Sequence, residues 1–105
     1  MAILYIAEFA TFTPPGAPGG LGQIAQQPTL AEQVVVIGAS STQSAAFNTN
    51  TRFVRLHCDV AAEVEFGTNP TAVLNTSARM AANQTEYFGV PKGQSFKVAV
   101  IAPTV

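Results

Sequence analysis

A strict alternation of apolar and polar side chains constrains the fold of this chain more than any other feature. It runs through residues 52–60 (RFVRLHCDV) and 62–67 (AEVEFG). Successive side chains of a β-strand point to opposite faces, so a period of two predicts half-buried strands. In the first strand, one face should carry Val54, Leu56, Cys58 and Val60, and the other Phe53, Arg55, His57 and Asp59. In the second, the pattern places Ala62, Val64 and Phe66 inside, and Glu63 and Glu65 on a solvated face.

Further short segments extend the strand pattern, and helical periodicity is poor throughout. A helix could begin at Thr29, but the β-branched run over residues 34–37 favours a strand. Residues 75–84 (NTSARMAANQ) lack a sustained apolar stripe and are predicted as a loop. About seven short strands remain, at 3–9, 34–38, 43–48, 52–60, 62–67, 85–90 and 95–101. Their number and spacing predict an all-β fold, a single antiparallel β-sandwich domain over residues 1–105.

The stretch 11–30 (TFTPPGAPGGLGQIAQQPTL) interrupts this pattern with proline and glycine and carries no charge. A solvated, disordered linker usually has charges and few hydrophobic residues, whereas this stretch has several. Proline-rich chain also loses less conformational entropy when it docks. We therefore expect an extended arm or interfacial loop; a cover over the chain's own sandwich and a disordered segment are the alternatives. The candidate interface residues in it are Phe12, Pro14, Pro15, Leu21 and Ile24.

The chain is poor in ions. Asp, Glu, Lys and Arg make up 10% of its residues, against roughly 25% in an average soluble domain. Uncharged polar surface costs less to bury than charged surface, because an ion loses far more hydration. The composition therefore favours a protein whose surface is covered by other subunits. A monomer with a coat of Thr and Asn is the alternative.

Charge and apolar runs also limit the classes of partner. The net charge is −1 and the five strong cations form no cluster, so nucleic acid is not an expected partner. No apolar stretch is long enough for a transmembrane helix, so no membrane association is expected. The start, MAILYIAEFATF, lacks a basic region and contains Glu8, unlike a signal peptide. The single cysteine, Cys58, rules out an internal disulfide and fits synthesis in a reducing cytoplasm.

No group of residues in the sequence has the pattern of a catalytic or metal site. His57 and Cys58 are adjacent, but strand neighbours point to opposite faces and cannot form a nucleophile–base pair. Glu63 and Glu65 lie on one strand rather than across a cleft, as glycosidase carboxylates do. GAPGGLG lacks the Lys-Ser/Thr ending of a phosphate-binding loop. We expect no enzyme activity, no catalytic residues, no metal and no cofactor.

An outward aromatic and arginine on the strand 52–60 are candidates for a contact surface. Phe53 shares its face with Arg55, and both residue types are enriched at the centres of protein interfaces. These two residues complete the predicted interface. The alternative is that this face is a second buried face of the sandwich.

The second half of the chain resembles the small β-sandwich virion proteins of tailed bacteriophages. The resemblance lies in RFVRLHCDVAAEVEFGTNPTA (52–72) and MAANQTEYFGVPKGQSFKVAVI (80–101). A strand there ends in a Gly and a Pro-containing turn, and a loop, an aromatic strand, a Gly turn and an apolar strand follow. For the capsid decoration, or cement, proteins, the resemblance implies a jelly-roll-like sandwich on the capsid exterior. It also implies the major capsid protein as a partner and a homodimer or homotrimer that bridges neighbouring capsomers.

Two other functions remain open from the sequence. One is a glycan- or receptor-binding module, which β-sandwiches commonly are and which would group exposed aromatic residues on one face. The other is a head–tail or fibre-associated component of a virion. The pattern of residues 52–72 and 80–101 is shared by several kinds of virion part and does not separate them.

Overall fold

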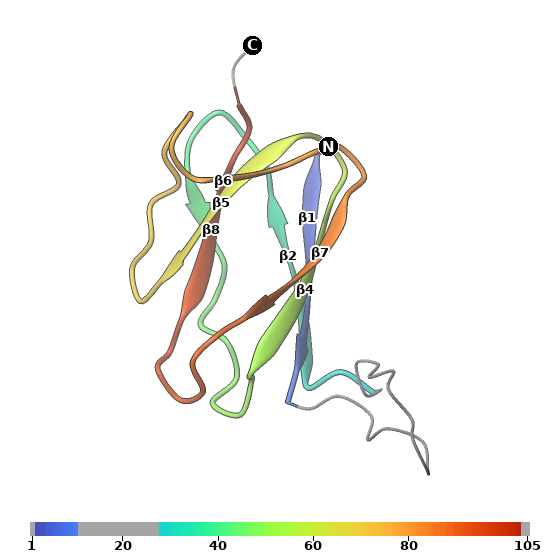
Figure 1. Cartoon of the computed structure of the whole chain (residues 1–105), viewed down its shortest axis with the longest axis vertical. Coiled ribbons are helices and arrows are strands. Elements are labelled where there is room, and N and C mark those ends of the chain that lie inside the picture. Colours follow the sequence, from blue (N-terminus) through green and yellow to red (C-terminus); the bar gives the residue numbers. More distant parts are fainter. Residues whose placement is uncertain (1, 11–27, 104–105) are drawn as a thin grey trace, which may run out of the picture.

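Eight strands in two antiparallel sheets make up the computed structural model, which describes residues 2–10 and 28–103. The first sheet has the order β2-β1-β4-β7 and the second β3-β8-β5-β6, and the described residues contain no helix (Figure 1). The strands are β1 (Ile3–Phe9), β2 (Ala31–Val36), β3 (Thr42–Gln43), β4 (Phe53–Cys58), β5 (Ala62–Gly67), β6 (Ala78–Met80), β7 (Thr85–Gly89) and β8 (Lys97–Ile101). This all-β architecture is consistent with the predicted β-sandwich.

The first sheet is organised around β1. Its residue Ala7 pairs with Glu32 of β2 on one side and with Arg55 of β4 on the other. Arg55 in turn pairs with Tyr87 of β7. These four residues therefore form one row across the sheet, and their side chains lie on the same face because paired residues share a face.

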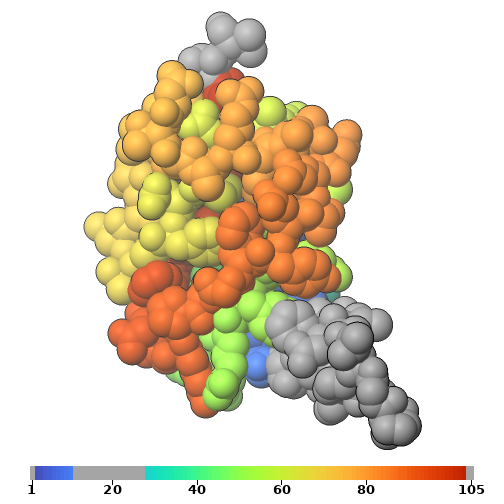
Figure 2. All heavy atoms as spheres, viewed as in Figure 1, coloured from blue at the N-terminus to red at the C-terminus, as the bar shows by residue number. Residues whose placement is uncertain are grey.

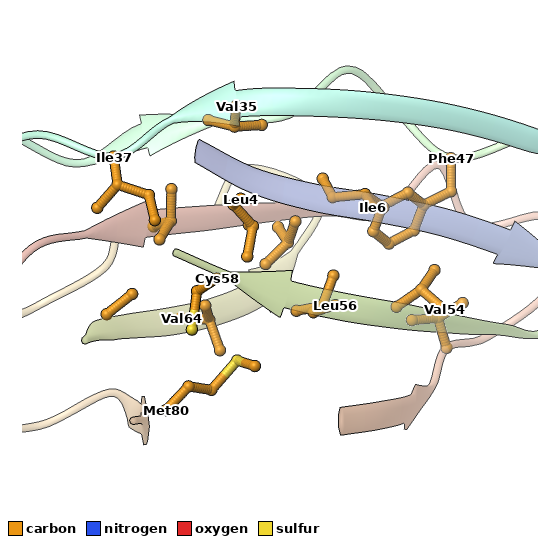
Figure 3. Close-up of a cluster of buried hydrophobic side chains, with 14 residues drawn as sticks. Leu4, Ile6, Val35, Ile37, Phe47, Val54, Leu56, Cys58, Val64 and Met80 are labelled. Carbon is orange, nitrogen blue, oxygen red and sulfur yellow. The ribbon is translucent and has the colours of Figure 1, made fainter. Parts of the chain in front are cut away.

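The core lies between the two sheets. Leu4 and Leu56 from the first sheet and Val64 from the second are at most 1% exposed. Figure 3 shows these side chains, with others from β1, β2, β4, β5 and β6, filling the space between the layers. Burying one such side chain stabilises the fold by about 2 kcal/mol. The alternation predicted for Val54, Leu56 and Cys58 and for residues 62, 64 and 66 is confirmed, because these positions point into this core. The inward place predicted for Val60 was wrong, because β4 ends at Cys58 and Val60 is 37% exposed.

Two predicted segments differ from the structure. Residues 75–84 contain the short strand β6, which pairs with β5, so this segment is more than a loop. The strand predicted over residues 43–48 ends at Gln43. Beyond it the chain still lies beside the strand β8, since the Ser44 amide donates to the Val98 carbonyl oxygen at 2.8 Å. The next amide, of Ala45, instead donates to the Gln33 side-chain oxygen at 3.0 Å, which ends the regular ladder.

The outer face of the second sheet is partly covered by the segment after β5. Ala72 and Leu74 pack on Ala99 and Ile101 of β8, away from the main core. Glu63 lies under this segment and is 1% exposed, so its predicted place on a solvated face was wrong. Glu65 on the same strand is exposed, as predicted. In the space-filling view (Figure 2), the chain from β5 to β7, in yellow and orange, covers most of the visible face.

Candidate binding surface

One face of the first sheet points away from the core, and we call it the outer face. Its positions follow from the alternation along four strands whose other residues fill the core. They are Ile3, Tyr5, Ala7 and Phe9 of β1; Glu32, Val34 and Val36 of β2; Phe53, Arg55 and His57 of β4; and Thr85, Tyr87 and Gly89 of β7. The outer face is therefore largely apolar and aromatic.

Several large side chains of the outer face are open to solvent. Val34 is 59% exposed, Val36 48%, Tyr5 48% and Tyr87 51%. A strand that needs only one buried face usually carries polar residues on the other. A contiguous group of exposed apolar side chains is typical of a surface that contacts a partner.

An aromatic cluster forms one end of the outer face. Phe9 and Phe53 are paired across β1 and β4, and their rings stack with centroids 5.1 Å apart. Tyr87 lies at a tilt to both rings, at 6.4 Å from Phe9 and 6.2 Å from Phe53. The Arg55 guanidinium carbon lies 5.6 Å from the Phe9 ring centroid. This cation–π contact holds the Arg55 side chain along the sheet surface.

The structure thus places the predicted interface residues Phe53 and Arg55 next to each other on the outer face. Phe53 is buried, at 6% exposed, and Arg55 is half-buried. Their role as interface residues stays a prediction. Tyr5, Phe9 and Tyr87 also lie on the outer face and were not among the predicted interface residues. Their signal is their register: each pairs directly with His57, Phe53 or Arg55 of β4.

A shallow, open hollow of about 510 Å³ lies in the middle of the outer face. Its walls come from Tyr5, Ile6, Ala7, Glu32, Gln33, Val34, Arg55 and His57 of the three strands β1, β2 and β4. The small side chain of Ala7 forms the floor of the hollow, between the larger side chains of Glu32 and Arg55. Glu32 and Arg55 stand on opposite sides of Ala7 in the same cross-strand row. The hollow is therefore apolar at its centre, with one acid and one base at its edges.

His57 and Cys58 do not form a catalytic pair, as the alternation predicted. The His57 Nδ1 atom lies 2.7 Å from the Thr85 hydroxyl on the outer face. The Cys58 thiol points to the core side and donates to the Ala81 carbonyl oxygen at 3.1 Å. Burial raises the pKa of the Cys58 thiol, so the thiol stays protonated and is a poor nucleophile at neutral pH.

Two buried carboxylates stabilise loops. Glu8 accepts hydrogen bonds at 2.7 Å from the Asn48 amide and from the Thr51 hydroxyl, and one at 3.1 Å from the Gln33 side chain. It thereby ties the loop before β4 to β1 and β2. This structural role of Glu8 was not predicted, although a lone charge at an inward position of an apolar strand is a signal for one.

Glu63 has fewer partners than Glu8. One of its oxygens accepts from the Asn75 amide at 2.7 Å, while its Oε2 atom is buried without a hydrogen-bond partner. Asn75 has a left-handed backbone, with φ of 62°, which turns its amide toward the carboxylate. Neighbouring Glu65 accepts from the Ser77 hydroxyl at 2.9 Å. Both glutamates therefore hold the segment 73–77, and they do not form a carboxylate pair across a cleft.

The described part of the chain shows no cluster of three or more His, Cys, Asp or Glu side chains that could hold a metal ion. Among residues 2–10 and 28–103, no helix has the length and apolar character needed to span a membrane. The predicted interface residues Phe12, Pro14, Pro15, Leu21 and Ile24 lie outside the described residues. Comparison of the chain with protein-family models, with curated proteins and with solved structures found no match.

Proposed function

We propose that this chain is a virion structural protein, a capsid decoration protein that stabilises the head and whose outer face is covered by another subunit in the assembly. The observation that carries the proposal is the exposed apolar outer face, with Tyr5, Val34, Val36 and Tyr87 each about half or more exposed. Such a face, in a chain with 10% charged residues, suits a subunit that is covered in its assembly. The resemblance of residues 52–72 and 80–101 to phage decoration proteins supports the virion setting.

The strand pairing supports a jelly-roll description of the sandwich. If the strands are taken in the cyclic order β2 to β8 and then β1, their pairs nest from the outside in. The first strand pairs with the last (β2–β1), the second with the seventh (β3–β8), the third with the sixth (β4–β7) and the fourth with the fifth (β5–β6). A jelly roll is an eight-stranded antiparallel ribbon of this kind, wound into two sheets.

In this description the jelly roll is circularly permuted, because β1 takes the place that would follow β8. The backbone contacts agree. The Ile37 amide donates to the Ala2 carbonyl oxygen at 2.9 Å, and the Ala102 amide donates to the Gly38 carbonyl oxygen at 2.8 Å. Residues 2 and 102 therefore flank the same two residues, so β1 begins close to the point where β8 ends (Figure 1).

The mechanism we propose is mechanical. Rigid sandwiches would sit at capsomer junctions, bound to the major capsid protein on the capsid exterior, with residues 11–30 laid across a neighbour. Each contact would be weak, but contacts repeated over a symmetric shell add up to large stabilisation. The side chains of Glu8, Glu63 and Cys58 fit a mechanical role, since each forms a hydrogen bond to a backbone group of its own chain and stabilises the fold.

The test is binding of the purified chain to shells assembled from the major capsid protein encoded with it. Co-sedimentation should show saturable binding at many copies per shell, and the shells should melt at a higher temperature. Binding of a few copies at one vertex would point to a head–tail or fibre role. Absence of binding to any shell form would reject the proposal.

Two variants locate the contact. Val34→Asp places a charge on the outer face and should reduce occupancy, because the charge must be desolvated in the contact. Its matched control is Val73→Asp, since Val73 is similarly exposed, at 49% against 59%, but lies outside the outer face.

Removal of residues 11–28 tests the arm. It leaves four residues between the paired Glu8 and Ala31, enough for a hairpin loop, and should abolish attachment without unfolding the sandwich.

A second candidate function is glycan or receptor binding, and one observation favours it. Tyr5 and His57 line the hollow beside the charged groups of Glu32 and Arg55. An exposed aromatic ring next to hydrogen-bonding groups can stack on a sugar. Titration with a panel of soluble sugars, followed by NMR shifts of His57, distinguishes this function. Lack of any response would dismiss it.

A further inference from the structure

We infer that the outer face packs against the outer face of a second copy of this chain, about a twofold axis that runs along β1. The inference rests on the proposed function, which makes the outer face a contact surface, and it names the occupant. It is drawn from the register of the first sheet and from the charges on the outer face.

The two strong charges of the outer face are placed symmetrically about β1. Glu32 and Arg55 are the only acid and the only strong base among the outer-face positions defined above. Both pair with Ala7, one from β2 and one from β4. Each therefore lies one strand spacing, about 4.8 Å, from the β1 axis, on opposite sides. A twofold rotation about that axis brings Glu32 of each copy opposite Arg55 of the other.

In the neighbouring cross-strand row, that of Tyr5, the rotation also brings compatible side chains together. Tyr5 of β1 pairs with Val34 on β2 and with His57 on β4. The rotation places Tyr5 over Tyr5 of the second copy, and the exposed Val34 over the edge of its His57 ring. In this row the exposed Tyr5 and Val34 thus meet aromatic groups, and no like charges meet. The pattern is self-complementary, as a twofold interface requires.

The packing of sheets tolerates this arrangement. Two sheets that pack face to face keep their strands within about 30° of each other. At about 4.8 Å from the axis, a crossing of that size displaces Glu32 from the opposite Arg55 by only about 2.5 Å along the strand. The flexible side chains span that displacement. The hollow over Ala7 gives room for the Tyr5 side chains of the two copies.

The size of the face sets the expected strength. With the axis along β1, the strands β2, β1 and β4 of the two copies overlap, and β7 of each copy extends beyond β2 of the other. Three strands about 4.8 Å apart and six residues long cover roughly 300 Å² in projection. This is below the roughly 800 Å² per partner of a standard stable interface, and it is typical of a weak, transient one. We therefore expect a weak dimer in solution, which repeated contacts on a shell would strengthen.

The occupant favoured by charge is a second copy, because only a copy of this chain must carry the matching base and acid at the mirrored positions. The other occupants are residues 11–27 of the same chain or a different protein. If either of these covered the outer face, reversing the charge of Glu32 or Arg55 would not change the oligomeric state. The experiment below therefore distinguishes them from a second copy.

The experiment is a charge swap between copies, followed by sedimentation equilibrium of the full chain from low micromolar to near-millimolar concentration. Arg55→Glu makes Glu32 face a glutamate, and Glu32→Arg makes Arg55 face an arginine. Each variant alone should weaken the dimer about tenfold or more, since two favourable pairs become two unfavourable ones. An equimolar mixture of the two variants should form a heterodimer of near wild-type affinity, because every acid again faces a base.

Far-UV circular dichroism confirms that each variant is folded. If Arg55→Glu does not fold, Val34→Asp replaces it, because Val34 is 59% exposed and its substitution leaves the core intact. This variant should be monomeric over the same concentration range, while Val73→Asp should dimerise like the wild-type chain.

The results separate this inference from the proposed function. A monomeric wild-type chain, or single variants that dimerise as well as wild type, would overturn the inference. So would failure of the mixture to recover the dimer. A monomer that still coats shells would leave the decoration function standing, whereas a dimer that binds no shell would leave the inference standing and reject the function.

Discussion

The carboxylate of Glu8 is the most informative single group to perturb, because it is 2% exposed and accepts three hydrogen bonds. Glu8→Gln keeps the shape of the side chain and removes its charge. A hydrogen bond to a charged group contributes about 1 kcal/mol more than a neutral one. The Asn48 and Thr51 bonds can persist to the amide oxygen, so together they should lose about 2 kcal/mol.

The third bond of Glu8 is lost in this variant. The new amide nitrogen faces the Gln33 Nε2 donor, where the carboxylate oxygen now accepts at 3.1 Å. Two donors that face each other leave both unsatisfied, which costs about 1 kcal/mol more. Relief from burying a charge offsets part of the total. We therefore expect a net destabilisation of about 2 kcal/mol, which lowers the melting temperature of a chain this size by about 10 °C.

The assay is urea unfolding monitored by circular dichroism, with the midpoint and slope fitted separately. The control is Glu65→Gln, the same substitution at an exposed glutamate, which should change the free energy of unfolding by less than about 0.5 kcal/mol. If Glu8→Gln is as stable as that control, the carboxylate does not stabilise the loop before β4, and the reasoning is refuted.

Three further predictions follow from burial. Glu63→Gln should leave stability unchanged or raise it, in contrast to the Glu8 variant, because Glu63 Oε2 is buried without a partner; a clear loss in urea unfolding would contradict this. Leu56→Ala should cost about 3 kcal/mol, since Leu56 is 0% exposed; a loss below about 1 kcal/mol would show that the core closes around the gap. Because the pKa of Cys58 is raised in the folded state, the folded protein holds the thiol proton more tightly than the unfolded chain does. The resulting contribution to stability is complete below the ordinary thiol pKa of about 8.5 and is lost as the pH rises through the higher pKa of the folded state. Cys58→Ala should therefore flatten the alkaline fall in stability, and the native thiol should react with a thiol reagent only as fast as the protein unfolds.

Local pattern determined much of the fold. The alternation of residues 52–60 and 62–67 predicted the strands β4 and β5 and the side chains that they send to the core, because a period of two is a property of the strand itself. The same rule separated His57 from Cys58. The ends of the strands were predicted less well. β6 was missed because three residues carry too little pattern, and β3 ended early because the Ala45 amide bonds to a side chain distant in sequence.

The candidate surface depended on the tertiary structure. The sequence pointed to Phe53 and Arg55, but only the pairing of β1 with β2 and β4 placed Phe9, Tyr5 and Glu32 beside them. Burial of the glutamates was also decided by tertiary contacts, because it depends on which distant segment packs over each one. Alternation tells which side of a strand a residue faces. Whether water, a loop or another subunit covers that side is decided by the rest of the fold.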